Sequence, residues 1–195
     1  MITRPITRSI TRAITRSIAG VETSVFIELE RAANADYSLS SDWVAGSGDD
    51  FSVSGYFVFS GTLDGDHLFA DANGASRIAV FSGGEVFTAG AVVGTLSSTA
   101  FMVDGNQHFI YISRISGSFV FNVDGTTLLT AANTEEFRFN AVGKKRGTPT
   151  SIPAFDGIIS KISLTHITTP ANSLEFELNS LNTNTETNNG VTLTY

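Results

Sequence analysis

"HFIYISRISGSFVFNVDGTTLL", residues 108–129, decides the fold class of this chain. Its first half alternates, so Phe109 and Tyr111 share one face of a strand, and Ile110 and Ile112 share the other. A Ser-Gly pair then predicts a tight turn, because two-residue hairpin turns need positive φ. The return strand at 119–123 ends at Asp124-Gly125, a second turn signal. The stretch therefore predicts an antiparallel hairpin.

Runs of the same kind recur on both sides of this hairpin, at 51–60, 77–84, 136–143 and 157–167. Each is rich in β-branched and aromatic residues, and each is bounded by Gly, Asp, Asn or Ser. Many short strands with turn signals every 8–12 residues are typical of an all-β sandwich or barrel. The nearest candidate for a helix, residues 26–36, reads equally well as a strand. The 15 phenylalanines are the expected filling between two sheets.

The composition narrows the classes of function. The chain has 195 residues, which suits one domain with appendages, and no cysteine, which excludes disulfides and thiolate metal sites. The formal net charge is -7; the four arginines of residues 1–20 contribute +4, which leaves -11 on the remainder. An acidic body argues against nucleic acid as its partner. No apolar run is long enough to span a membrane.

The first twenty residues repeat Ile-Thr-Arg four times. As a helix the repeat would be amphipathic, but Ile and Thr are poor helix formers and Pro5 suits only a first turn. We interpret the segment as an arm that orders on a partner; a solvated tail and a mitochondrial-type presequence are the alternatives. The anchoring residues would be Ile2, Arg4, Ile6, Arg8, Ile10, Arg12, Ile14, Arg16 and Ile18.

Residues 25–167 resemble a laminin-G-like or concanavalin A-like jelly roll. The resemblance rests on an R-x-x-G-x5-V-D-G hairpin and on a late F-x-G-x-I-x-x-I-x-L strand. The matching residues are Arg114, Gly117, Val123, Asp124 and Gly125, and Phe155, Gly157, Ile159, Ile162 and Leu164. It implies the fold but little about function, since this fold hosts lectins, glycosidases, receptor-binding modules and spacers.

The arm itself resembles the N-termini of bacteriophage tail and fibre proteins. The resemblance implies a virion protein attached by residues 1–20, with a sandwich at 21–170 displayed on the particle surface or tail. Residues 171–195 would form a C-terminal hairpin or an inter-subunit segment. Other virion proteins and a host-surface polysaccharide are the implied partners, and a homo-oligomer, by analogy a trimer, is expected. The alternative is a freestanding lectin-like module.

Two sets of residues are candidates for ligand binding. Trp43, Tyr37, Tyr56 and Tyr111 could stack on a sugar if they are exposed. Lys144, Lys145 and Arg146 form the only basic cluster outside the arm, on a loop bounded by glycine and proline that would meet an anionic partner. A plain solvated loop is the alternative for the second set.

No cofactor is expected, with calcium as the alternative. Turn aspartates are the oxygen ligands that calcium prefers, and the candidates are Asp64, Asp66, Asp71 and Asp124. We expect no enzyme, because catalytic motifs are missing from the sequence and the three histidines lack metal-ligand spacing. Glu28 with Glu30 and Glu175 with Glu177 are the only carboxylate pairs that a glycosidase hypothesis could use.

Overall fold

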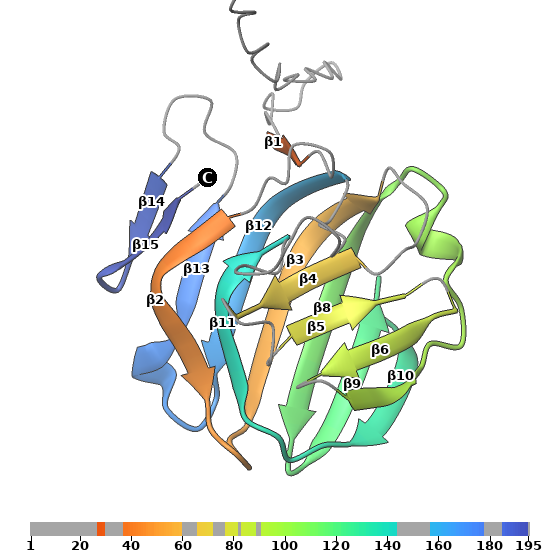
Figure 1. Cartoon of the computed structure of the whole chain (residues 1–195), viewed down its shortest axis with the longest axis horizontal. Helices are drawn as coiled ribbons and strands as arrows, with labels where there is room; N and C mark the ends of the chain where they lie inside the picture. The colour runs from red at the N-terminus through yellow and green to blue at the C-terminus, as the bar shows by residue number, and fades with distance from the viewer. Residues whose placement is uncertain are drawn as a thin grey trace, which may run out of the picture.

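The computed structural model describes residues 27–29, 37–59, 66–71, 77–81, 83–88, 91–143, 157–177 and 185–194. Two antiparallel sheets pack face to face. We call them sheet A, which contains β3 (Phe51–Phe59) and β8 (Gln107–Ile115), and sheet B, which contains β4 (Asp66–Ala70) and β5 (Arg77–Val80) and lies in front of sheet A in Figure 1. The expected all-β, laminin-G-like or concanavalin A-like jelly-roll sandwich is confirmed.

Sheet A has the order β1-β12-β3-β8-β9-β10, and β13 also pairs with β12. Its strands are β1 (Ile27–Leu29), β3 (Phe51–Phe59), β8 (Gln107–Ile115), β9 (Ser118–Val123), β10 (Thr126–Ala132), β12 (Gly157–His166) and β13 (Leu174–Glu177). Sheet B has the order β14-β15-β2-β11-β4-β5-β6-β7. Its strands are β2 (Tyr37–Ala45), β4 (Asp66–Ala70), β5 (Arg77–Val80), β6 (Glu85–Thr88), β7 (Ala91–Thr95), β11 (Phe137–Val142), β14 (Thr185–Asn188) and β15 (Val191–Thr194).

The core lies between the sheets and is built largely from phenylalanine. Strand alternation turns every second side chain inward, so β3 buries Phe51, Val53, Phe57 and Phe59. Fully buried rings of the two sheets contact one another, edge to face between Phe57 and Phe69 and stacked between Phe119 and Phe137. Such contacts add to the stabilisation from buried apolar area.

Three two-residue turns close the hairpins where the sequence predicts them. Ser116-Gly117, Asp124-Gly125 and Asn189-Gly190 all have positive φ at both residues, as this kind of turn requires. The first turn joins β8 to β9, so the predicted hairpin is confirmed in its strands and in its turn.

The C-terminal strands are divided between the two sheets. β13 extends sheet A along β12, whereas β15 joins sheet B beside β2. β13 and β15 therefore lie in different sheets and do not form a hairpin with each other. The hairpin in this region instead pairs β14 with β15.

Gly55 lies where β3 faces an irregularity of β12, between Ile159 and Ile162. A Cβ at this position would lie 2.7 Å from the main-chain oxygen of Lys161 and 2.9 Å from the Phe57 ring. Gly55→Ala should therefore lower the free energy of unfolding by about 1–3 kcal/mol, measured by urea denaturation. Ser54→Ala, at the adjacent outward position, is the control and should change it by less than about 0.5 kcal/mol. Equal stability of the two variants would contradict the packing described.

Within the described part of the chain, no helix has the length and apolarity that crossing a bilayer requires.

Candidate functional site

Three aromatic side chains lie on the outer face of sheet A, the side turned away from sheet B. Tyr56 on β3 is paired with Phe109 on β8, and Tyr111 follows two residues along β8. Tyr56 is 38% exposed, and Phe109 and Tyr111 are half-buried. The rings of Tyr56 and Phe109 contact each other with centroids 5.0 Å apart. We call these three residues the aromatic face.

Neutral polar side chains lie beside much of the aromatic face, and the Asp124 carboxylate accepts from the Phe109 N–H at 2.8 Å. Ser54 and Asn122 flank Tyr111 in the register of β3, β8 and β9. Asn122 donates to the Thr127 hydroxyl, and Gln107 donates to the Ser160 hydroxyl, both at 3.4 Å. The amides and hydroxyls of this surface therefore offer both donors and acceptors beside the rings.

The charged pair bordering this surface is neutralised. Lys161 on β12 forms an ion pair with Glu175 on β13. Glu175 was one of the sequence candidates for a catalytic carboxylate pair, and in the structure it is exposed and bound to this lysine. The side chains of Glu28 and Glu177, and the whole of Glu30, lie outside the described part.

This arrangement suits a neutral sugar chain. The C–H faces of pyranose rings pack on aromatic rings, and their hydroxyls need donors and acceptors beside those rings. Strand alternation predicts that Phe109 and Tyr111 share a face. Because the strand is apolar on both faces, it does not predict which face meets solvent.

Trp43 corrects the expectation of an exposed stacking residue. It is 4% exposed, it stacks on Phe139 with ring centroids 5.7 Å apart, and its indole N–H donates to the main-chain oxygen of Asn172 at 2.9 Å. The alternation of β2 turns Trp43 inward with Leu39 and Ala45. Trp43 also lines a hollow beside β2.

That hollow has a volume of about 320 Å³. It lies among β2, the 3₁₀ turn η3 (Pro170–Asn172) and the β14–β15 turn, and Asp42, Asn172 and Asn189 contribute its polar lining. The Asp42 carboxylate accepts hydrogen bonds from Asn140 at 2.7 Å and from Arg138 at 3.1 Å. The hollow is therefore polar and close to neutral.

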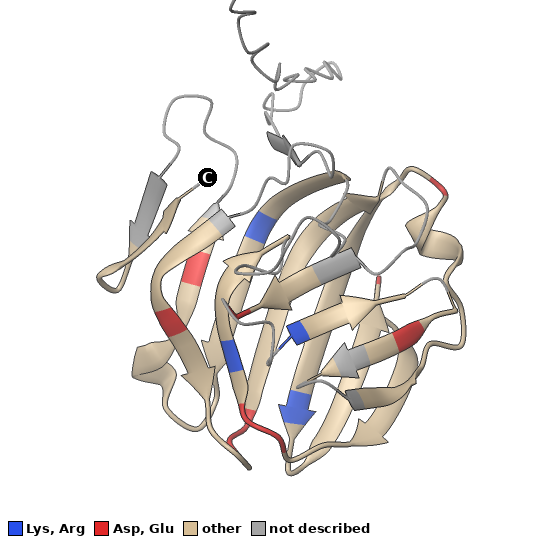
Figure 2. Ribbon diagram, in the orientation of Figure 1, with Lys and Arg blue, Asp and Glu red and all other residues tan. Residues whose placement is uncertain are grey.

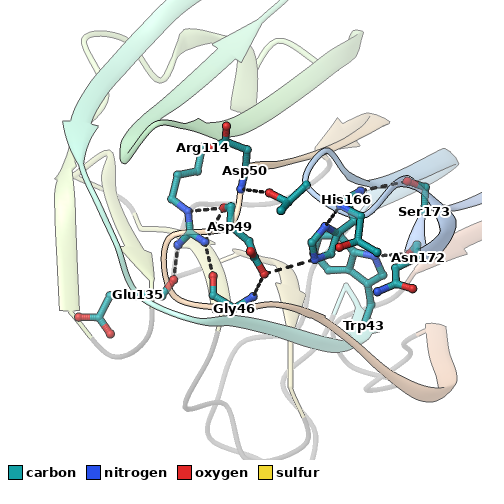
Figure 3. A network of polar contacts seen from close by, with 11 residues as sticks. Trp43, Gly46, Asp49, Asp50, Arg114, Glu135, His166, Asn172 and Ser173 are labelled. Carbon is teal, nitrogen blue, oxygen red and sulfur yellow. Dashed lines mark hydrogen bonds and ion pairs between the residues drawn. The ribbon is translucent and has the colours of Figure 1, made fainter.

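A polar network at one end of the sandwich holds the loops together (Figure 3). Arg114 is fully buried on β8, where its guanidinium lies 5.0 Å from the Phe51 ring centroid and 5.4 Å from that of Phe137. It donates to the main-chain oxygens of Gly46, Asp49 and Glu135. Burial lowers the pKa of Arg114, and the nearby Asp49 and Asp50 carboxylates oppose this.

His166 continues this network toward η3. It is 3% exposed, its Nδ1 accepts from the Thr169 N–H at 2.9 Å, and its Nε2 lies 3.5 Å from Asp49 Oδ2. The Asp49 carboxylate also accepts from the Gly46 N–H. Acidic residues gather in the loops at this end (Figure 2), and we assign the network a structural role.

His108 forms a second polar cluster, at the start of β8. It is 9% exposed, with Nδ1 2.6 Å from Asp124 Oδ2 and Nε2 3.0 Å from Asp104 Oδ1. Burial lowers the pKa of His108, but the hydrogen bonds with Asp104 and Asp124 outweigh burial, so the pKa is raised overall. The His108 hydrogen bond is the main cause that lowers the pKa of Asp104 to about 2. For Asp124, burial raises the pKa, but hydrogen bonds from His108 and the Phe109 N–H lower it overall.

This cluster predicts a pH dependence of stability. A raised histidine pKa contributes stability that is complete below its unfolded value of about 6.5 and is lost as pH rises through the folded value. The lowered carboxyl pKa values contribute stability above about pH 4 that is lost as pH falls toward 2. Urea midpoints of the native chain should therefore fall more between pH 6 and 9 than those of His108→Gln. Parallel pH profiles of the two proteins would contradict this account.

Only two of the four calcium candidates, Asp71 and Asp124, have side chains within the described part. Asp124 is bound to His108, as above. Asp71 is buried after β4, and its Oδ1 has no hydrogen-bond partner among the described residues. Asp64 and the side chain of Asp66 lie outside the described residues. Across the described ranges, no three histidine or acidic side chains are grouped so that they could hold a metal ion.

Two other candidate segments fall outside the described residues. These are the arm, with its anchoring residues Ile2 to Ile18, and the basic loop with Lys144, Lys145 and Arg146. Their partner assignments stay predictions from the sequence.

No protein-family model matches the chain, and no curated protein matches it either. A solved structure from Bacteroides ovatus, provisionally assigned as a carbohydrate-binding protein, aligns at 11% identity with a TM-score of 0.57, over 82% of this chain and 57% of its own. Domains LG4-5 of the mouse laminin α1 chain align at 16% identity and a TM-score of 0.46, over 90% of this chain and 50% of theirs. An alginate lyase of polysaccharide lyase family 7 aligns at 12% identity and a TM-score of 0.39, over 77% and 73%.

The first of these similarities shows a shared fold, and this chain spans a little over half of that protein's length. The similarities to the laminin domains and to the alginate lyase are too low to add to this conclusion. None of the three supports the phage origin or the virion partners expected from the Ile-Thr-Arg repeat.

Proposed function

We propose that this chain is a carbohydrate-binding β-sandwich module that holds a glycan on the aromatic face of sheet A. The observation that carries the proposal is the Tyr56–Phe109 ring pair on the outer face of sheet A, with the hydroxyl of Ser54 and the amides of Gln107 and Asn122 nearby. Three rings of this size contribute apolar contact at low entropic cost. The shared fold with the Bacteroides ovatus protein, itself provisionally assigned to carbohydrate binding, supports the proposal.

The ligand class follows from the charge around the aromatic face. Lys161 and Glu175 neutralise each other, and the Asp124 carboxylate beside Phe109 is bound to His108. A neutral polysaccharide meets no repulsion here, and an anionic one gains no unpaired cation among the described side chains of this surface. We propose binding without catalysis, because Glu175 is occupied by Lys161.

A glycan array with the full chain tests this function, with immobilised neutral polysaccharides in affinity electrophoresis as the second readout. We expect binding to at least one neutral glycan, unchanged by a calcium chelator. Failure to bind any glycan, with and without calcium, would contradict the proposal.

We also propose, from the sequence repeat alone, that residues 1–20 attach the module to a larger particle, with a virion as the leading candidate. Such an arm would display the module on the particle, where a homo-oligomer would multiply weak glycan contacts. Deleting residues 2–18 should remove the chain from purified particles and leave its unfolding transition unchanged. Incorporation of the truncated chain at the normal level would contradict the arm's role.

A further inference from the structure

The hollow beside Trp43 exists because two strands of sheet B diverge. β15 pairs with β2 only at Ser38 and Leu39, and the Thr192 N–H then bonds to the Ser40 hydroxyl. Beyond this point the β14–β15 turn and η3 flank β2 and line the hollow together with it. An open strand edge presents main-chain N–H and C=O groups to whatever fills such a hollow.

The walls of the hollow combine an aromatic edge with fixed polar groups. Trp43 and Val191 supply apolar contact, and Asp42, Asn172 and Asn189 supply oxygen and amide groups. The Asn189 amide is held in place because it donates to the main-chain oxygen of Ser173 at 2.7 Å. The Asn172 main-chain oxygen is occupied by the Trp43 indole, which leaves its side-chain amide as the group that a ligand would meet.

The charges of the lining select the class of ligand. The Asp42 carboxylate would repel a ligand carboxylate or phosphate. A cationic ligand would gain little from Asp42, because Arg138 and Asn140 already bind this carboxylate. A small neutral molecule with several hydroxyls is not repelled by Asp42 and needs no unpaired carboxylate to bind. The volume of about 320 Å³ falls at the lower end of the range for small-ligand sites, roughly 300–1,000 Å³.

We propose that this hollow is a separate binding site for one neutral pyranose ring or a polyol of similar size. The Asp42 carboxylate accepts from ligand hydroxyls, the Asn172 and Asn189 amides donate to them, and the indole edge of Trp43 contacts the ring. The site is distinct from the aromatic face, because it lies between β2 of sheet B and the η3–β13 segment and shares no residue with that face.

The test uses the only tryptophan of the chain as the reporter. Trp43 emission of the full chain is titrated with glucose, galactose, mannose, N-acetylglucosamine and glycerol. We expect a saturable change with at least one of them, half-complete at roughly 1–50 mM. A linear or absent response to all five would overturn the proposal.

Variants in the hollow locate the response. Ala171→Phe places a ring at the exposed 3₁₀ turn that lines the hollow and should abolish saturation, and Asn172→Ala should weaken it at least threefold while its main-chain oxygen still receives the indole. Tyr56→Ala, on the aromatic face, should leave the titration unchanged. An undiminished response in Ala171→Phe would overturn the proposal. Because Tyr56→Ala changes only the aromatic face, its titration distinguishes a failure of binding in the hollow from a failure of glycan binding on sheet A.

Discussion

Replacing Arg114 with methionine should lower the free energy of unfolding by about 3–5 kcal/mol. The variant leaves three main-chain oxygens, those of Gly46, Asp49 and Glu135, without their charged donor in a buried site. The Gly46 oxygen keeps the Asp49 N–H as a donor, but an unsatisfied buried acceptor at Asp49 or Glu135 costs about 1–3 kcal/mol each. The cation–π contacts with the Phe51 and Phe137 rings are lost as well. Urea denaturation followed by Trp43 fluorescence and by circular dichroism measures the change.

Arg138→Met is the matched control for this prediction. Arg138 lies on β11, and it is exposed and bound to Asp42 and Glu136 by surface ion pairs. Such pairs contribute about 0–1 kcal/mol, so this variant should stay close to the native chain. If Arg114→Met lost no more than Arg138→Met, the guanidinium would not be holding the loops at this end of the sandwich.

Replacing Tyr56 and Tyr111 together with alanine should abolish measurable glycan binding. Exposed aromatic anchors at the centre of an interface typically contribute 2 kcal/mol or more when they are truncated, which is about 30-fold in affinity for each residue. Calorimetric titration with a glycan selected on the array measures the loss. Because both side chains point away from the core, the variant should unfold near the native urea midpoint.

Tyr56→Phe and Val92→Ala are the controls for the binding loss. The first keeps the ring that stacks on the sugar, and the second shortens a side chain that is 52% exposed on sheet B. Both should retain affinity within about threefold of the native chain. Unchanged affinity in the double alanine variant would place the glycan elsewhere.

The hairpin at the centre of the chain could be predicted because its signals are local. Alternation in β8 and β9 and the Ser116-Gly117 turn are properties of adjacent residues, and the structure confirms them. The same alternation places Arg114 on the inward face with Ile110 and Ile112. This inward position was the one signal in the sequence for a buried arginine. The role of Arg114 could not be predicted, because the loop carbonyls that it binds come near it only in the folded chain.

The candidate sites depended on contacts between distant segments. The Trp43 hollow combines β2 with residues more than a hundred positions later, where β15 leaves the sheet. Likewise, His108 meets Asp124 through a turn and Asp104 through the preceding loop. Sequence periodicity cannot predict where two strands of a sheet separate. For this reason the sequence leaves Trp43 as a candidate exposed aromatic, and only its stacking on Phe139 in the structure shows that it is buried.

The most direct test of the account is a nuclear magnetic resonance titration of the isotope-labelled full chain with the selected glycan. The account predicts saturable shifts of the Tyr56, Phe109 and Tyr111 amide signals, with an apparent Kd equal to the calorimetric value. Glycan binding that leaves these three signals unmoved would contradict the proposal that the outer face of sheet A is the carbohydrate site.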